Sequence, residues 1–246
     1  MSRDKYFKDL LLAFKQSLEE NGEGDTAAQI PFVGEIEEYR GETFEKKHIQ
    51  LFSIVAHLLN MVEVKAAVDE RRTKEKPDMR SVEGLFAGNI KRLLEQGFSE
   101  NEILKALPSL RIEPVLTAHP TEAKRATVLE HHRDVFLEFK TLLESSLSMA
   151  EKKSTESRLR RGLYKLWHTG EIFIEKPDVA SERRNVLHYF SDVFPEVVPS
   201  LDRRLKYAFE ANGMDVEKLI ENEAFPRYRF GDWVGGDRDG HPFVTS

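Results

Sequence analysis

Apolar side chains recur at helical spacing through most of the chain. Residues 4–20 place Phe7, Leu10, Phe14 and Leu18 on one face, which predicts an amphipathic helix. The same spacing predicts further helices over residues 44–70, 81–96, 121–147, 154–170 and 181–212. A short capped helix is expected from about Ser99 to Leu107. The intervening segments 23–34 and 71–80 are polar and contain proline, so we expect loops there.

Two short runs break the helical pattern. Residues 112–116 and 230–234 are apolar or aromatic enough to predict strands, and each is followed directly by a polar motif. Pro114 weakens the first strand because proline cannot donate a backbone hydrogen bond to a neighbouring strand. The pattern therefore predicts a mainly α protein with a few short strands. We place a helical region at residues 1–110 and a second region, which begins with the first strand, at residues 111–246.

Composition narrows the class of protein. The 246 residues are 40% hydrophobic and 33% charged, which fits a helix-rich globular protein and argues against general disorder. The net charge of −6 gives no overall attraction for nucleic acid, and the absence of cysteine excludes disulfides and thiolate metal sites. We find no signal-peptide core and no apolar run long enough to span a bilayer. A cytoplasmic protein with no membrane and no nucleic-acid partner is expected.

The first motif, V-L-T-A-H-P-T-E at residues 115–122, contains a candidate catalytic histidine. A residue before proline avoids helical geometry, while proline itself suits the first turn of a helix, so His119 should lie at a strand-to-helix junction. The exposed amides of that helix start attract anions, and Lys124 and Arg125 add positive charge. An imidazole titrates near neutral pH, and nearby cations favour its neutral form. His119 is therefore a candidate acid or base beside an anion.

Simpler roles compete with this interpretation of the histidine. A His-Pro pair at a helix start is by itself more often a capping or hydrogen-bonded residue than a catalytic one. His131 and His132 lie farther along the same predicted helix, where we expect solvated side chains. No H-E-x-x-H pattern and no cysteine is present, so a zinc site is not expected.

The second motif, F-G-D-W-V-G-G-D-R-D-G-H-P at residues 230–242, is rich in glycine. Its paired glycines allow a ligand to approach the backbone closely. Asp237 and Asp239 flank Arg238 and can orient its guanidinium toward a planar anion. Taken alone, the segment also matches a surface turn, since Gly and Asp are frequent turn residues. Its spacing fits neither a calcium-binding EF-hand nor a nucleotide-binding loop.

Together, the two motifs resemble the phosphoenolpyruvate carboxylase family. Their order and separation agree with that family, and L-Y-K-L-W-H-T-G-E-I at residues 163–172 is similar to another of its stretches. The resemblance runs from about residue 115 to 246 and more loosely before it. It implies an α-rich elaboration of a (β/α)8 TIM-like barrel and a lyase that joins phosphoenolpyruvate and bicarbonate to give oxaloacetate and phosphate. Family members fix carbon dioxide to supply the tricarboxylic acid cycle, use Mg²⁺ or Mn²⁺, and usually form homotetramers.

The resemblance also implies roles for individual residues. His119 occupies the position of the family histidine that helps release carbon dioxide beside the enolate of pyruvate. Substrate-binding roles are implied for Lys124, Arg125, Arg238, Asp237 and Asp239. Position 241 is His where the family usually has Asn, which leaves that contact open. No metal ligand is expected in this chain, because the family's metal-binding carboxylates lie in its later part.

The length of the chain, compared with that of the family, leads to a last expectation. Family members are several times longer, and two strands cannot close a barrel that needs eight. We therefore expect an N-terminal fragment of the enzyme that is inactive alone. One alternative is a non-catalytic helical module that binds a phosphorylated metabolite or a partner subunit. Another is a phosphohistidine carrier, which the large helical framework disfavours.

Overall fold

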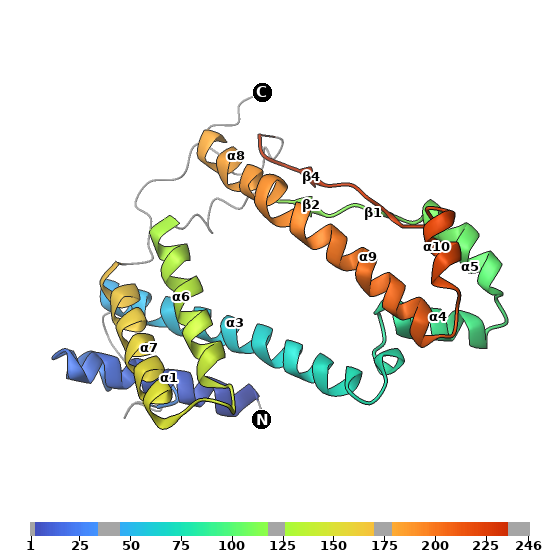
Figure 1. The fold of residues 1–246 in the computed structure, drawn as a ribbon. Coiled ribbons are helices and arrows are strands. Elements are labelled where there is room, and N and C mark those ends of the chain that lie inside the picture. Colours follow the sequence, from blue (N-terminus) through green and yellow to red (C-terminus); the bar gives the residue numbers. More distant parts are fainter. Residues whose placement is uncertain (1–2, 34–44, 118–125, 170–178, 236–246) are drawn as a thin grey trace. The chain divides into compact units, whose positions relative to one another are not determined.

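The protein divides into two compact units, seen in a computed structural model that describes residues 3–33, 45–117, 126–169 and 179–235 (Figure 1). One unit comprises Met1–Asp69 with Lys124–Ile174, and the other comprises Glu70–Ala123 with Glu175–Ser246. Each unit has its own hydrophobic core. The chain thus passes from the first unit to the second, returns once to the first and then enters the second again. The predicted division at residue 110 concerned the start of a catalytic barrel, and it stays a prediction.

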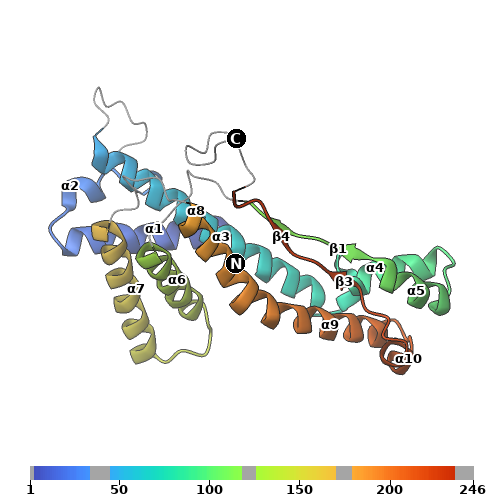
Figure 2. The ribbon, with the colours of Figure 1, turned by 90° about the horizontal axis from the view of Figure 1, so that it is seen from above.

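The first unit is a packed set of helices. It contains α1 (Arg3–Glu20), α2 (Gly24–Ala27), the first part of α3 (Lys46–Glu75), α6 (Ala126–Leu142) and α7 (Met149–Thr169). Helices α6 and α7 lie side by side in Figures 1 and 2, and a Cβ built on Gly162 would come within 3.1 Å of the Val135 side chain. The core is built from apolar stripes of these helices, including Leu10, Leu11, Phe14, Ile54, Leu58, Val62, Phe139, Leu159 and Leu163.

A buried polar group links α1 to α3 in this unit. The Tyr6 hydroxyl donates a 2.8 Å hydrogen bond to the Asp69 carboxylate, which also forms an ion pair with Lys65. The Lys65 ammonium lies 5.4 Å from the centroid of the Tyr6 ring. Burial, together with the hydrogen bond and charge of Asp69, raises the pKa of Tyr6 to about 12. The Tyr6 phenol therefore stays neutral through ordinary pH and keeps its hydrogen bond to Asp69.

Helix α3 is more apolar than the sequence analysis allowed. An 18-residue window within it has a mean hydropathy of 1.5, so it is long and apolar enough by composition to cross a membrane. The expectation that no run reaches that length was wrong for this helix. In the structure, 39% of the window is buried, and Leu51, Ile54 and Leu58 pack into the core of the first unit.

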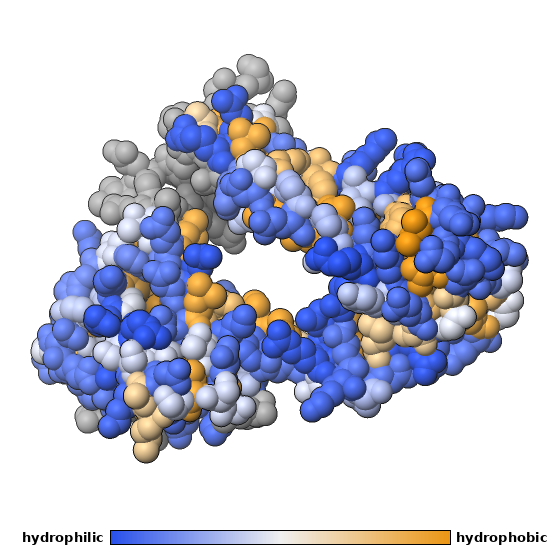
Figure 3. Space-filling model, in the orientation of Figure 1, coloured by the Kyte–Doolittle hydropathy of each residue, from blue (hydrophilic) through white to orange (hydrophobic). Residues whose placement is uncertain are grey.

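The second unit combines helices with short strands. Its remaining helices are η1 (Met79–Ser81), α4 (Phe86–Glu95), α5 (Glu100–Ala106), η2 (Leu107–Ser109), α8 (Val179–His188), the π-helix η4 (Tyr189–Val193), α9 (Phe194–Ala211) and α10 (Val216–Glu221). The core lies between α4, α5, α9 and α10, and includes Ile90, Ile103, Leu205, Phe209 and Leu219. The surface shown in Figure 3 is largely hydrophilic over both units.

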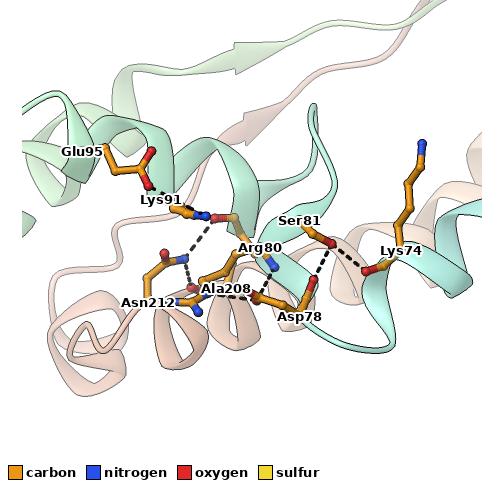
Figure 4. A network of polar contacts seen from close by, with 9 residues as sticks. Lys74, Asp78, Arg80, Ser81, Lys91, Glu95, Ala208 and Asn212 are labelled. Atoms are coloured by element: carbon orange, nitrogen blue, oxygen red, sulfur yellow. Dashed lines mark hydrogen bonds and ion pairs between the residues drawn. The ribbon is translucent and has the colours of Figure 1, made fainter.

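Hydrogen bonds from side chains to backbone carbonyl oxygens hold α4 against α9 (Figure 4). The Asn212 amide donates to the carbonyl oxygens of Ala87 at 3.1 Å and Ala208 at 2.7 Å, and so connects the two helices. The Ser81 hydroxyl donates to the Asp78 carbonyl at 2.7 Å and closes the turn before α4. The Ala208 carbonyl is among the last four of α9, which have no partner in the helical ladder, so Asn212 satisfies it.

Most predicted helices are confirmed, with shifted ends. The predicted capping box is present, since the Ser99 hydroxyl accepts from the Glu102 amide and the Glu102 carboxylate accepts from the Ser99 amide. The loops predicted at residues 23–34 and 71–80 were wrong in part, because α2 lies in the first and α3 continues through Glu75 into the second. An ion pair of 2.7 Å between Lys74 and Glu70, one helical turn apart, supports this last turn of α3.

Two leucines of α1 provide a matched test of the first core. Leu10 is buried and Leu12 is exposed, at 1% and 44% of their surface. We expect Leu10→Ala to lower the free energy of unfolding by about 2–5 kcal/mol, because the substitution leaves a cavity. Leu12→Ala, the control, should cost less than about 1 kcal/mol. Urea denaturation followed by circular dichroism measures both, and equal losses would contradict this packing of α1.

Candidate functional site

The strands that precede the two motifs are neighbours in the second unit. They are β1 (Arg111–Ile112), β2 (Val115–Leu116), β3 (Arg227–Tyr228) and β4 (Gly231–Asp232). Strand β1 pairs with β3 and β2 pairs with β4, both in parallel. The two predicted strand regions are therefore confirmed, although each is split in two and the second begins three residues earlier than expected.

One register runs through both strand pairs. Backbone amides of the second segment donate to carbonyls of the first at 2.9–3.1 Å, in the order Arg227 to Leu110, Arg229 to Ile112, Gly231 to Pro114 and Trp233 to Leu116. Pro114 has no N–H and cannot return a hydrogen bond to the facing strand. Pro114 therefore interrupts a single ladder and leaves two short pieces, β1 and β2.

Helix α9 and the π-helix before it cover one face of this ladder (Figures 1 and 2). The Phe230 ring stacks on Phe194 with centroids 3.9 Å apart and an angle of 11° between the ring planes. Phe190 meets the Phe194 ring edge-on at 5.5 Å. These aromatic contacts attach the segment just before β4 to the start of α9.

A buried polar pair lies farther along the same face. An Asp202 carboxylate oxygen on α9 and the Tyr228 hydroxyl on β3 are buried without a hydrogen-bond partner in the described part of the chain. Burial raises the pKa of Asp202, against the opposing charge of Lys206. Burial and the charge of Asp202 raise the pKa of Tyr228. Both shifts are therefore in the direction of the protonated, uncharged form.

Because β2 and β4 pair in parallel, both motifs continue from the same edge of the ladder. Leu116 and Asp232 are register partners at the carboxyl ends of β2 and β4. The last described residues at this edge include Thr117, exposed Trp233, and Gly235, whose φ of 73° explains the need for glycine there. Trp233 lies directly after β4 and was not among the predicted site residues, because the sequence placed it inside the predicted strand.

The predicted site residues themselves lie outside the described residues. These are His119, Lys124, Arg125, Asp237, Arg238 and Asp239, and His241 belongs with them. Their mutual distances and contacts stay predictions. What the structure contributes is the arrangement of the strands from which both motifs follow.

Comparison with known proteins identifies the family. The family model for phosphoenolpyruvate carboxylase matches residues 5–246. The chain belongs to the phosphoenolpyruvate carboxylase family. It is similar to phosphoenolpyruvate carboxylase of Methylorubrum extorquens, with 34% identity over 203 residues that cover 80% of this chain and 21% of that protein. Phosphoenolpyruvate carboxylase 1 of Chlamydomonas reinhardtii is 32% identical over 85% of this chain and 21% of its own length.

A third relative gives the same picture. Phosphoenolpyruvate carboxylase of Paraburkholderia xenovorans is 32% identical over 80% of this chain and 19% of its own length. The chain thus spans about a fifth of the length of the curated relatives that it matches. The resemblance drawn from the two motifs is confirmed at the level of the family.

The described residues offer no metal centre of their own. No group of three or more His, Asp or Glu side chains among them is placed to hold a metal ion. Two histidines do meet in the first unit, where the rings of His57 and His132 lie edge-on with centroids 4.8 Å apart. His132 is therefore packed against a partner, and the expectation of a merely solvated side chain was wrong.

Engineered cysteines test the register on which the shared edge depends. Continuing the register places residue 117 opposite residue 233, at the roughly 4.8 Å strand spacing that a disulfide can bridge. We expect Thr117→Cys with Trp233→Cys to form an intramolecular disulfide on mild oxidation. The chain has no native cysteine to compete. Non-reducing electrophoresis and mass spectrometry detect the product.

The control for this experiment moves one cysteine along the same strand segment. Position 227 lies six residues before 233, or about 20 Å at strand spacing. Thr117→Cys with Arg227→Cys should therefore stay reduced under the same conditions. Oxidation of the control pair as efficiently as the test pair would refute the parallel register.

Proposed function

We propose that this chain forms part of a phosphoenolpyruvate carboxylase, which joins phosphoenolpyruvate and bicarbonate to give oxaloacetate and phosphate. The observation that carries the proposal is the parallel pairing of β2 with β4, since the two signature motifs follow directly from the same edge of these strands. Membership of the family supports it. In parallel α/β sheets, active sites form at the carboxyl ends of the strands.

The arrangement suits a barrel enzyme. Parallel strands with a helix packed along one face are the repeating unit of a (β/α)8 barrel, and eight such strands are needed to close it. The further strands would come from outside this chain. We also propose, from the family, a homotetramer in the cytoplasm.

In the proposed reaction, His119 removes a proton from the carboxyl group of an intermediate. Bicarbonate attacks the phosphoryl group, which yields carboxyphosphate and the enolate of pyruvate. His119 then takes the proton of the carboxyl group as carbon dioxide and phosphate separate, and the enolate carbon attacks the carbon dioxide. The neutral imidazole that this step needs would be favoured by Lys124 and Arg125.

The remaining motif residues would bind anions. Lys124, Arg125 and Arg238 would neutralise phosphate and carboxylate groups, and we expect Asp237 or Asp239 to hold the Arg238 guanidinium in orientation. A divalent metal, Mg²⁺ or Mn²⁺, would supply further charge neutralisation for the enolate and phosphate oxygens. Its carboxylate ligands are proposed to lie outside this chain.

Substitution of the motif histidine tests the proposed chemistry. In a full-length carboxylase that carries this sequence, we expect His119→Asn to lower oxaloacetate formation by roughly 10²–10⁴ and to leave phosphoenolpyruvate binding nearly unchanged. His131→Asn is a matched control, because that histidine lies beyond the motif in α6. A coupled malate dehydrogenase assay and a binding titration give the two readouts. Near-normal oxaloacetate production by His119→Asn would exclude the proposed role.

The chain by itself should lack carboxylase activity. The metal ligands and the remaining barrel strands are proposed to lie outside it, so neither the enolate nor the phosphate would be held. The purified chain is assayed with phosphoenolpyruvate, bicarbonate, Mg²⁺ and malate dehydrogenase. Bicarbonate-dependent turnover above that of its His119→Asn variant would show a complete site within these residues and contradict the expectation.

A further inference from the structure

A π-helix lies beside the strand that leads into the glycine motif. In η4 the Phe194 amide donates to the Tyr189 carbonyl, five residues earlier, where an α-helix would bond four residues back. Pro195 explains this wider turn, because it has no N–H to offer the Ser191 carbonyl and its ring would clash with that carbonyl in a regular α-helix. Single π-turns are frequent at functional sites, and this one determines where two aromatic rings lie.

The wider turn sets both rings against Phe230. A π-turn holds more residues than an α-turn, so side chains four positions apart, such as Phe190 and Phe194, lie almost directly above each other. The Phe194 ring stacks on Phe230 with centroids 3.9 Å apart, and the Phe190 ring meets both of the others edge-on, at 5.5 Å and 6.4 Å. Three rings in mutual contact therefore define the position of Phe230.

The chain that leaves β4 is held at two further points. The Asp232 carboxylate accepts from the Val234 amide at 3.0 Å, which forms a turn directly after the strand. Gly235 follows with a φ of 73°, and a Cβ built on it would lie 3.7 Å from a methyl group of Val179, at the start of α8. The helical segment that carries the two rings therefore also meets the chain just before the charged residues of the motif.

We propose that Phe194 is a positioning residue for the glycine motif, and that its ring fixes the point from which the chain continues to Arg238. Arg238 follows Gly235 by three residues in the sequence, so a shift of Phe230 reaches it over only a few residues of chain. A misplacement of about 1 Å caused by a distant substitution can lower a rate by about 10²-fold. The inference rests on the proposed function, because it takes Arg238 to bind a substrate anion.

A purely structural role for the ring is the simplest alternative. Loss of the ring would then lower the stability of the second unit without a selective effect on substrate binding. Phe209 provides a matched control, because it is a fully buried phenylalanine of the same helix and belongs to the core of the second unit. It lies 15 residues after Phe194, or about 22 Å along the helix axis.

Kinetics of a full-length carboxylase that carries this sequence separate the two roles. We expect Phe194→Leu to raise the KM for phosphoenolpyruvate by at least about tenfold and to change kcat less, because a misplaced Arg238 weakens ground-state binding. Phe194→Tyr keeps an aromatic ring, so its KM should stay within about threefold of the original value. Phe209→Leu should lower the melting temperature at least as much as Phe194→Leu and leave KM unchanged. Phe190→Leu removes only edge-on contacts and should raise KM by a smaller factor, which keeps the test decisive if Phe194→Leu folds poorly.

Fluorescence of Trp233 tests the position of the segment without any catalysis. The chain contains two tryptophans, so Trp167→Phe leaves Trp233, directly after β4, as the single fluorophore of the purified chain. In that background, we expect Phe194→Leu to increase the local motion of Trp233, measured as a lower plateau in time-resolved anisotropy. Phe194→Tyr and Phe209→Leu should leave the plateau unchanged. Circular dichroism checks folding throughout.

Several results would overturn the proposal. These are an unchanged KM in Phe194→Leu, an equal rise of KM in Phe194→Tyr, and an equal rise in Phe209→Leu, which would indicate a general loss of stability. Unchanged motion of Trp233 in Phe194→Leu would show that the ring does not hold the segment. If the full-length protein makes no oxaloacetate, the proposed function fails, and the Trp233 measurement alone then decides whether Phe194 fixes the start of the motif.

Discussion

The parallel ladder between residues 110–116 and 227–233 is the constraint on which the second unit depends. Its partners are 117 positions apart in the sequence, from Leu110 to Arg227, so a long loop must close before any of these hydrogen bonds form. Four amide-to-carbonyl contacts at 2.9–3.1 Å would not offset that entropy alone. Packing of Phe230 on Phe194 and burial of the α4–α9 core supply the remaining stabilisation.

The same ladder relates the two motifs. Because the pairing is parallel, β2 and β4 have their carboxyl ends at one edge, and any chain that leaves them begins from neighbouring points. An antiparallel pair would have sent the histidine and glycine motifs from opposite edges. Strand direction, more than the motif residues individually, therefore makes a shared site feasible. Pro114 interrupts the ladder but leaves its register intact, since its carbonyl still accepts from Gly231.

The helices were predicted well because the apolar residues that pack into the cores recur at helical spacing along the sequence. The residues expected on one face of the first helix, such as Leu10 and Phe14, are buried in the core of the first unit. Strand boundaries were less predictable, since Arg111, Arg227 and Arg229 occupy positions where an apolar residue would have signalled a strand. The end of α3 was missed because its last turn is polar and rests on the Lys74–Glu70 pair. The common edge follows from the parallel pairing of β2 with β4, because parallel strands have their carboxyl ends at the same edge.

The two faces of the ladder have opposite chemistry. Helix α9 covers the side with Tyr228 and Phe230, where burial raises the pKa values of Tyr228 and Asp202. The other face carries Arg111, Arg227 and Arg229, which are exposed in the described part of the chain. Burying that face would require partners for three guanidinium groups, because an unpaired buried charge is strongly unfavourable. Any surface that covers it must therefore offer oxygen acceptors to these guanidinium groups, so a purely apolar helix or strand would be disfavoured.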